Sequence, residues 1–396
     1  MFEKIVLRRS DTGLALTLGE VAEALLFYQN VHLVLDPSSL QSLGQSLGLQ
    51  ELLALIARKR LTAVYAEDTI MCQTRIMGGI PRHNFNTVVP AGRINELAKK
   101  TRRERLQIQL EKLTTSRGEA RRYADKFMDL IQIKRYAGDY FAPEGIHKSA
   151  TADMTDATYV TEAIRRVLQN EVGFEHFADN LRVDVIHLEG QFVVQSNINF
   201  EIGNARRAAL SPPLGQLTES IFLLMLFDAN ADVNIASFYG GDFYTSPMNS
   251  EIAQIRFAEL LRRTGISMKH LQQFKNIVLA DYPSIREVIN SKERSFGEFE
   301  RLLDQSDRWH RNINKMGPDT NLVSEYFKQV THEGWVSSLP AKIIRYVIGL
   351  GIEGALNPIA KGAWSIADTL LIDKLKGWRP NHFVDEKLKP FLDKDR

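Results

Sequence analysis

Two hydrophobic periods alternate along the N-terminal part of the chain. Short apolar runs with the length of buried strands are separated by segments in which apolar side chains recur at helical spacing. Thr17 and Glu20 form a capping box in front of the first such segment. We predict strands at residues 3–8, 31–36 and 61–66, and helices at residues 18–27 and 49–60. A strand, a helix and a strand in this order predict a parallel βαβ unit.

The next part of the chain turns from an alternating pattern to a helical one. Residues 71–89 are rich in β-branched side chains and contain two glycines, which favours two short strands. Residues 94–137 predict a long helical segment. Ser116 and Glu119 form a second capping box inside it, so we expect a break near Gly118.

The second half of the chain begins with a change in composition. Residues 141–156 contain proline, glycine and small polar side chains, which is typical of a linker. Glu189-Gly190 lies between two strand-like runs and predicts a hairpin. We predict a helix at residues 157–170, strands at 183–188 and 191–200, a buried helix at 217–228 and helices from residue 250 onward. Ser295 and Glu298 form a third capping box in this last part.

Together these patterns predict a mixed α/β (α+β) fold, with an N-terminal βαβ-type region followed by a predominantly helical region that holds a β-hairpin. We expect four parts. They are an α/β region at residues 1–93, a basic helical segment and linker at 94–150, an α+β region at 151–339 and a Gly-rich helical C-terminal region at 340–396.

The composition indicates the cellular compartment of the protein but not its function. The single cysteine, Cys72, excludes an intramolecular disulfide and fits a reducing compartment. No signal-peptide core follows the N-terminus, and no run of about 18 apolar residues is present. We therefore expect a cytoplasmic protein. The formal net charge of +2 favours no particular partner for the molecule as a whole.

Two stretches of the C-terminal third have a sequence that resembles other proteins. Residues 285–296 read IREVINSKERSF, and residues 368–384 read DTLLIDKLKGWRPNHFV. Both resemble segments shared by a scattered group of uncharacterised bacterial proteins. The resemblance implies a bacterial protein, and by analogy with other scattered families a role in anti-phage defence. It implies no catalytic residues.

Three carboxylates follow predicted strands. Asp36 ends one strand, and Glu67 and Asp68 end another. Ligands of parallel sheets bind beyond the carboxyl ends of the strands, and oxygen ligands suit Mg²⁺. If the strands are neighbours, the three side chains could hold a cation for phosphodiester hydrolysis. The alternative is that Asp36 caps a helix while the other two lead into solvent.

A basic stretch stands out against the near-neutral chain. Residues 99–122 contain nine Lys or Arg and three Glu, a local net charge of +6. Such a stretch could contact nucleic acid or anionic lipid headgroups, or it could be a solvated helix face. The residues of this predicted anionic-ligand patch are Lys99, Lys100, Arg102, Arg103, Arg105, Arg121 and Arg122.

The C-terminal region is apolar and rich in small residues. Such a segment suits either a membrane interface or a tightly packed helical hairpin inside the protein. The residues predicted to contact a membrane or a partner are Ile348, Leu350, Ile352, Leu356, Ile359, Trp364 and Trp378. Gly349, Gly351 and Gly354 match the spacing of a dinucleotide-binding loop, but Pro358 interrupts the helix that such a loop requires.

No other motif for catalysis, zinc or nucleotide binding is present, so no cofactor is predicted. Two classes of function follow. The first is a non-enzymatic binding, sensor or effector protein, which engages a protein partner or itself and attaches peripherally to an anionic membrane through its C-terminal region. The alternative is a metal-dependent nuclease or phosphodiesterase that uses the three carboxylates and is guided to nucleic acid by the basic stretch.

Overall fold

The computed structural model of the chain describes residues 4–9, 15–90, 100–138, 141, 145–240, 242–244, 248–249, 251–253, 255, 285–305 and 391. Within these residues, helices occur together with one parallel and one antiparallel sheet. The predicted mixed α/β fold is therefore confirmed. The predicted C-terminal region lies outside the described residues, apart from Phe391.

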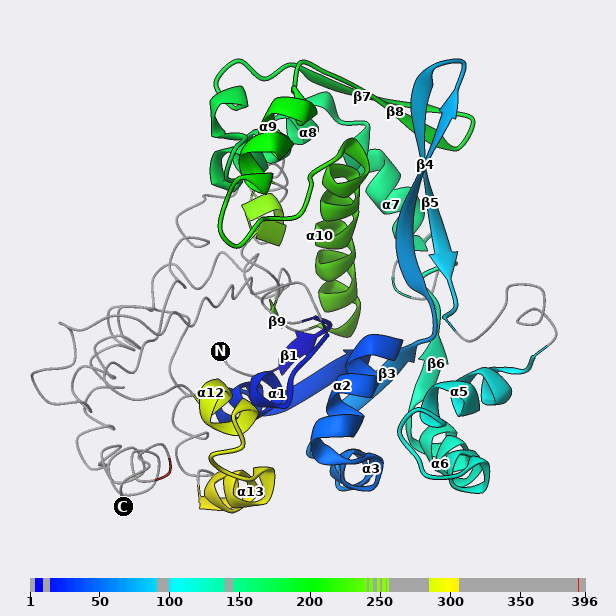
Figure 1. Cartoon of the computed structure of the whole chain (residues 1–396). Coiled ribbons are helices and arrows are strands. Elements are labelled where there is room, and N and C mark those ends of the chain that lie inside the picture. Colours follow the sequence, from blue (N-terminus) through cyan, green and yellow to red (C-terminus); the bar gives the residue numbers. More distant parts are fainter. Residues whose placement is uncertain are drawn as a thin grey trace, which may run out of the picture.

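A five-stranded parallel sheet forms the lower half of the molecule (Figure 1). Its strands are β1 (Lys4–Leu7), β2 (Asn30–Leu35), β3 (Thr62–Ala66), β6 (Gln132–Lys134) and β9 (Asp242–Tyr244). The order across the sheet is β6-β3-β2-β1-β9, and all neighbours are parallel. The predicted parallel pairing of the second and third strands is confirmed. Because β9 lies on the other side of β1 from β2, the strand order reverses at β1.

Both faces of this sheet are buried, as expected for parallel strands. Ile5, Leu7 and Leu33 point to one face and join a core with the helices there. Val6 and Val34 point to the other face and join a second core. The helices of the first core are α1 (Leu18–Phe27), α2 (Pro37–Leu47), α3 (Leu49–Ala57), α5 (Arg102–Leu110), α6 (Arg117–Leu130), α12 (Ile285–Asn290) and α13 (Phe296–Gln305).

The second core joins the sheet to the upper half of the molecule. A long central helix, α10 (Glu219–Tyr239), runs from the parallel sheet toward the top of Figure 1. Around it lie α7 (Gly145–Met154), α8 (Ala157–Asn170), α9 (Phe200–Ala208), and the strands β4 (Thr69–Met77), β5 (Ile80–Val88), β7 (Val183–Leu188) and β8 (Gln191–Ser196). These strands form an antiparallel sheet in the order β4-β5-β8-β7. Phe227 of α10 is fully buried and stacks on Phe85 of β5 at 4.7 Å between ring centroids.

Capping side chains begin the helices where the sequence predicts them. The Thr17 hydroxyl accepts a hydrogen bond from the Glu20 backbone N–H, and the Glu20 carboxylate accepts one from the Thr17 N–H. The same reciprocal pair joins Ser295 and Glu298. Ser116 caps α6, so the predicted break in the helical segment is confirmed. Each cap satisfies N–H groups that the first turn of a helix leaves unpaired.

Four predicted boundaries are wrong. The helix predicted at residues 217–228 is α10, which continues to Tyr239. The helical segment predicted to residue 137 ends earlier, and Gln132–Lys134 is the edge strand β6. The hairpin strand predicted to residue 200 ends at Ser196, because the Asn199 side chain accepts the Ile202 N–H and begins α9. The segment predicted as a linker contains α7, whose buried residues Ile146, Ala150 and Met154 belong to the second core.

A close helix crossing depends on Gly19. Its N–H donates to Asn290 Oδ1 at 2.8 Å, and a methyl group at Gly19 would overlap the backbone of Arg286 in α12. We expect Gly19→Ala to lower the free energy of unfolding by about 1–3 kcal/mol, because α1 and α12 must separate. Gly118→Ala is the control, since no atom lies within 4 Å of a methyl group at that helical position. It should be neutral or stabilising in urea denaturation, and equal effects at both sites would contradict the prediction.

Candidate anion-binding site

The carboxyl ends of the parallel strands carry the polar residues that the sequence singles out. β1 leads into Arg8, β2 into Asp36, β3 into Glu67 and β6 into Arg135. Since the strands are parallel and adjacent, these residues lie along one edge of the sheet. This edge is where parallel α/β sheets bind their ligands.

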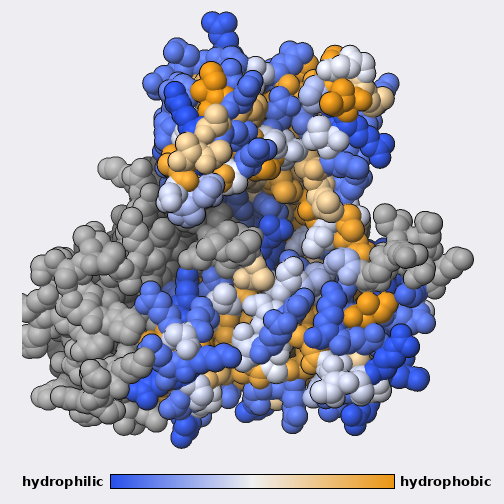
Figure 2. Space-filling model, in the orientation of Figure 1, coloured by the Kyte–Doolittle hydropathy of each residue, from blue (hydrophilic) through white to orange (hydrophobic). Residues whose placement is uncertain are grey.

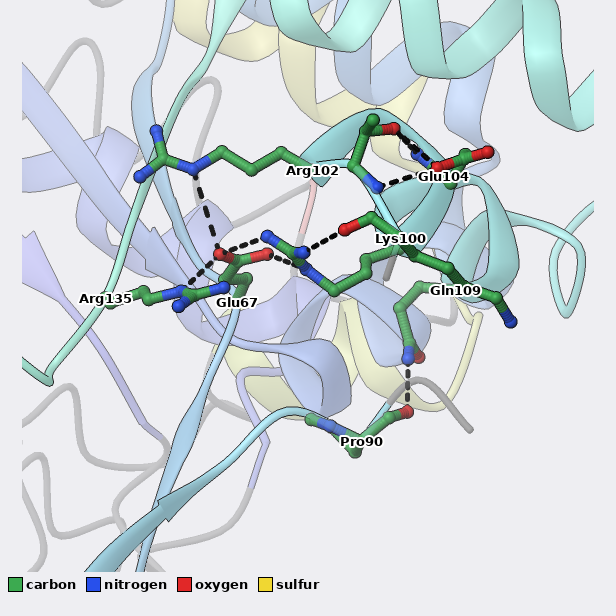
Figure 3. A network of polar contacts seen from close by, with 9 residues as sticks. Glu67, Pro90, Lys100, Arg102, Glu104, Gln109 and Arg135 are labelled. Carbon is green, nitrogen blue, oxygen red and sulfur yellow. Dashed lines mark hydrogen bonds and ion pairs between the residues drawn. The ribbon is translucent and has the colours of Figure 1, made fainter. Parts of the chain in front are cut away.

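Glu67 lies at the centre of an arginine cluster (Figure 3). Arg105 donates through Nε to Oε2 at 2.8 Å and through Nη2 to Oε1 at 3.0 Å, which is a two-point contact. Arg135 donates through Nε to Oε1 at 2.5 Å. Arg102 adds a third guanidinium, with Nε 3.9 Å from Oε1. We call Arg102, Arg105 and Arg135 around Glu67 the arginine site.

The arginines keep Glu67 ionised although only 2% of the residue is exposed. Burial alone raises the pKa of a carboxyl group. The hydrogen bonds from Arg105 and Arg135 outweigh burial, and the net result is a pKa below the usual value. Glu67 is therefore a carboxylate at neutral pH, and its charge orients the guanidinium groups around it.

Three guanidinium groups converge on the single carboxylate of Glu67. Arg105 alone matches the charge of Glu67 and uses both of its oxygens. Arg102 and Arg135 add two further charges, and their side chains are 46% and 36% exposed. The N-terminus of α5, which Thr101 caps, lies beside them and adds the positive end of a helix dipole. The arrangement brings three guanidinium groups and the N-terminus of α5 to one edge of the sheet.

Asp68 holds the chain that carries Arg135. Its carboxylate accepts the backbone N–H groups of Tyr136 at 2.7 Å and Ala137 at 3.2 Å. Burial raises the pKa of Asp68, and these two hydrogen bonds oppose the rise only in part. The side chain therefore fixes the exit from β6 and with it the start of the Arg135 side chain.

The three candidate carboxylates have separate structural contacts. Asp36 caps α2, where Oδ1 accepts the Ser39 N–H at 2.6 Å. Glu67 binds arginines and Asp68 binds backbone N–H groups, and both are buried, so the expectation that they lead into solvent is wrong. Among the described residues no group of three or more His, Cys, Asp or Glu is placed to hold a metal ion. A cation shared by the three carboxylates is therefore unsupported.

The predicted basic patch does not form one continuous surface. Arg102 and Arg105 belong to the arginine site, and Arg105 is buried. Arg103 donates to Asp125 of α6 at 2.5 Å. The backbone carbonyl of Lys100 accepts a hydrogen bond from Arg105. Arg121 and Arg122 are exposed on α6. The hydrogen bond from Arg103 lowers the pKa of Asp125, with a smaller contribution from Arg121. Hydrogen bonds from Thr115 lower the pKa of Glu119, with a smaller contribution from Arg122. Lys99 lies outside the described residues.

A second charged cluster lies at the end of β1. Arg8 is 3% exposed and donates through Nε to Asp232 Oδ1 at 2.5 Å. Its Nη2 donates to Asp228 Oδ1 at 3.3 Å, and Arg9 Nη1 donates to Asp228 Oδ2 at 2.9 Å. The Arg8 guanidinium also lies 6.0 Å from the centre of the Tyr136 ring. This cluster ties the parallel sheet to α10, and its charges balance.

Arg135 is the site residue that the sequence interpretation misses. Arg135 lies in the segment predicted to be helical. Just before it, apolar Ile131 and Ile133 alternate with polar Gln132 and Lys134. Alternation over so few residues is a weak signal, but it is the signal of a strand. Read as a strand, this segment places Arg135 at a carboxyl end beside Glu67.

The residues predicted to contact a membrane or a partner all lie outside the described residues. They are Ile348, Leu350, Ile352, Leu356, Ile359, Trp364 and Trp378. Within the described residues, no helix is long and apolar enough to cross a membrane. The chain matches no family model, no curated protein and no solved structure.

Proposed function

We propose that this chain is a non-enzymatic binding or effector protein that recognises an anionic group at the arginine site. The observation that carries the proposal is the convergence of three guanidinium groups on the single carboxylate of Glu67. Arg105 neutralises the carboxylate, while the half-exposed Arg102 and Arg135 add charge at the carboxyl edge of a parallel sheet. A phosphate or carboxylate group suits these planar donors.

A binding function agrees better with this edge than hydrolysis does. Asp36 and Asp68 each hold backbone N–H groups, and Glu67 is held by arginines. Replacing these contacts with a metal ion would require the edge to rearrange. The proposed effector role includes contact with a protein partner or a second copy, and membrane attachment through residues 340–396, as the sequence predicts.

The test is isothermal titration of the full chain with inorganic pyrophosphate. We expect Arg102→Gln with Arg135→Gln to weaken binding at least tenfold, because each charge-assisted contact contributes about 1.5–3 kcal/mol. The matched control is Arg58→Gln with Arg60→Gln, which removes two exposed arginines that pair with Glu51 and Asp304. The control should bind like the wild type. Equal affinity in both double variants, or no binding by the wild type, would reject the arginine site as an anion site.

A further inference from the structure

The turn of the β4–β5 hairpin lies at the top of the molecule, away from the parallel sheet (Figure 1). Ile76 is 76% exposed, Met77 46% and Ile80 50%. The two residues between the strands, Gly78 and Gly79, have φ of 59° and 80°, which makes the tight turn that lets Met77 pair with Ile80. Figure 2 shows hydrophobic side chains in orange at this end of the molecule.

The stem of the hairpin is fixed in the protein, so the tip is held outward. Phe85 packs against Phe227 of α10 and against Phe192 of β8. His83 is 2% exposed and contacts Thr74 across the hairpin at 3.0 Å and Glu219 of α10 at 3.0 Å. Beyond His83, β5 has no further pairing with β8. The outer part of the hairpin is therefore a two-stranded arm on a rigid base.

Two arginines lie directly behind the tip. Arg75 and Arg82 are opposite each other in the register, one pair below Ile76 and Pro81 and two below Met77 and Ile80. Like charges in directly opposed positions destabilise a strand pair. Among the described residues, the carboxylate found within ion-pair distance of Arg82 is that of Glu189, at 3.8 Å, and the Glu189 side chain is 87% exposed. An anion outside the protein would relieve the repulsion.

The spacing matches the interface of a lipid bilayer. Residues on one face of a strand are about 7 Å apart, since each residue advances the strand by about 3.4 Å. Met77 and Ile80 therefore reach about 7 Å past the arginine pair. Interfacial elements bury apolar side chains about 5–10 Å deep, at the boundary of headgroups and acyl chains. At that depth the two guanidinium groups lie at the level of the lipid phosphates.

We propose that the tip of the β4–β5 hairpin inserts into the interface of an anionic membrane. Ile76, Met77 and Ile80 enter the acyl boundary, and Arg75 and Arg82 bind phosphate groups of the lipids. The inference deepens the proposed membrane attachment by naming a second element for it. It does not depend on the arginine site, which lies at the edge of the other sheet.

The test is flotation of the full chain with vesicles of phosphatidylcholine, with and without phosphatidylserine. We expect binding that requires phosphatidylserine. Ile76→Ser with Ile80→Ser should lower the partition coefficient more than tenfold, since burial of each isoleucine side chain at the acyl boundary raises the partition coefficient severalfold. Arg75→Gln with Arg82→Gln should lower it about fivefold for each arginine.

Three controls keep the outcomes separate. Ile202→Ser with Leu210→Ser removes two other exposed apolar side chains and should leave flotation unchanged. Arg102→Gln with Arg135→Gln should float like the wild type, so failure of the arginine site and failure of the hairpin are distinguishable. Ile352→Asp with Leu356→Asp reports on the C-terminal region in the full chain.

The inference is overturned if the wild type does not float with anionic vesicles, in which case the apolar tip is left as a contact for a protein partner. It is also overturned if the hairpin variant floats like the wild type, whatever the C-terminal variant does. Loss of flotation in the hairpin variant, with an unchanged circular dichroism spectrum and thermal midpoint, supports it. The substituted side chains are exposed, so these folding measurements should not change.

Discussion

Arg8→Met is expected to lower the free energy of unfolding by about 3–5 kcal/mol, because it removes the cation from a buried ion-pair cluster. Arg8 is 3% exposed and donates to both Asp228 and Asp232. Without Arg8, both carboxylates stay buried with less compensation, and the sheet loses the buried part of its polar contact with α10. Urea denaturation of the purified full chain measures the change.

Two further variants give this prediction its control. Arg58 is more than half exposed and pairs with Glu51 on the surface, so Arg58→Met should cost no more than about 1 kcal/mol. Adding Asp232→Asn to Arg8→Met should recover part of the lost stability, because it removes one of the charges left behind. An Arg8→Met protein as stable as the wild type would show that the cluster contributes little.

Local signals in the sequence predict much of the fold. The capping pairs Thr17–Glu20 and Ser295–Glu298 begin helices in the structure. The apolar runs at residues 31–36 and 61–66 become neighbouring parallel strands. These features depend on residues close together in the chain, and one set of nearby contacts satisfies each of them.

The parts that sequence patterns miss depend on distant contacts. β6 and β9 are three residues long, and each becomes a strand because a longer neighbour supplies its hydrogen bonds. Three residues show too little of the hydrophobic spacing to distinguish a strand from a helix. For this reason the sheet order was not predictable, although the parallel pairing at its centre was.

The candidate site shows the same limit. The sequence presents Glu67 and Arg105 as members of two different hypotheses, one for a metal and one for a basic surface. They form a two-point ion pair across 38 residues of chain. Their residue types predicted that Glu67 and Arg105 belong to a functional site. Only the placement of α5 beside the end of β3 shows that the two side chains bind each other. In the structure the Glu67 carboxylate accepts hydrogen bonds from Arg105 and Arg135.

His32 is expected to make the protein sensitive to mild acid. It lies on β2, is 7% exposed, and its ring stacks on Tyr239 of α10 at 3.8 Å. Nδ1 contacts the Thr62 hydroxyl at 2.8 Å, while Nε2 is buried with no hydrogen-bond partner among the described residues. Burial, with the charges of Lys4 and Lys134, lowers the pKa of His32 to about 3.

The sign of the effect follows from where the proton binds. The unfolded chain takes up a proton at His32 near pH 6.5, whereas the folded protein excludes it until about pH 3. The contribution of His32 to stability is therefore complete above the unfolded pKa, and it falls as the pH drops through that value toward the folded pKa. At pH 4 the loss is about 3 kcal/mol, from about 1.4 kcal/mol for each pH unit.

His32→Phe isolates the effect of His32 protonation on stability. The phenyl ring can still stack on Tyr239, and the Thr62 hydroxyl keeps its hydrogen bond to the Val31 carbonyl at 3.3 Å. The variant should gain stability relative to the wild type as the pH falls from 7 to 4, by about 3 kcal/mol in urea denaturation. Exposed His176, replaced by Gln, should show no such gain. If the difference between wild type and His32→Phe stays constant across this range, His32 is protonated in the folded protein. The packing of His32 against α10 would then have to accommodate a positively charged imidazole close to Lys4 and Lys134.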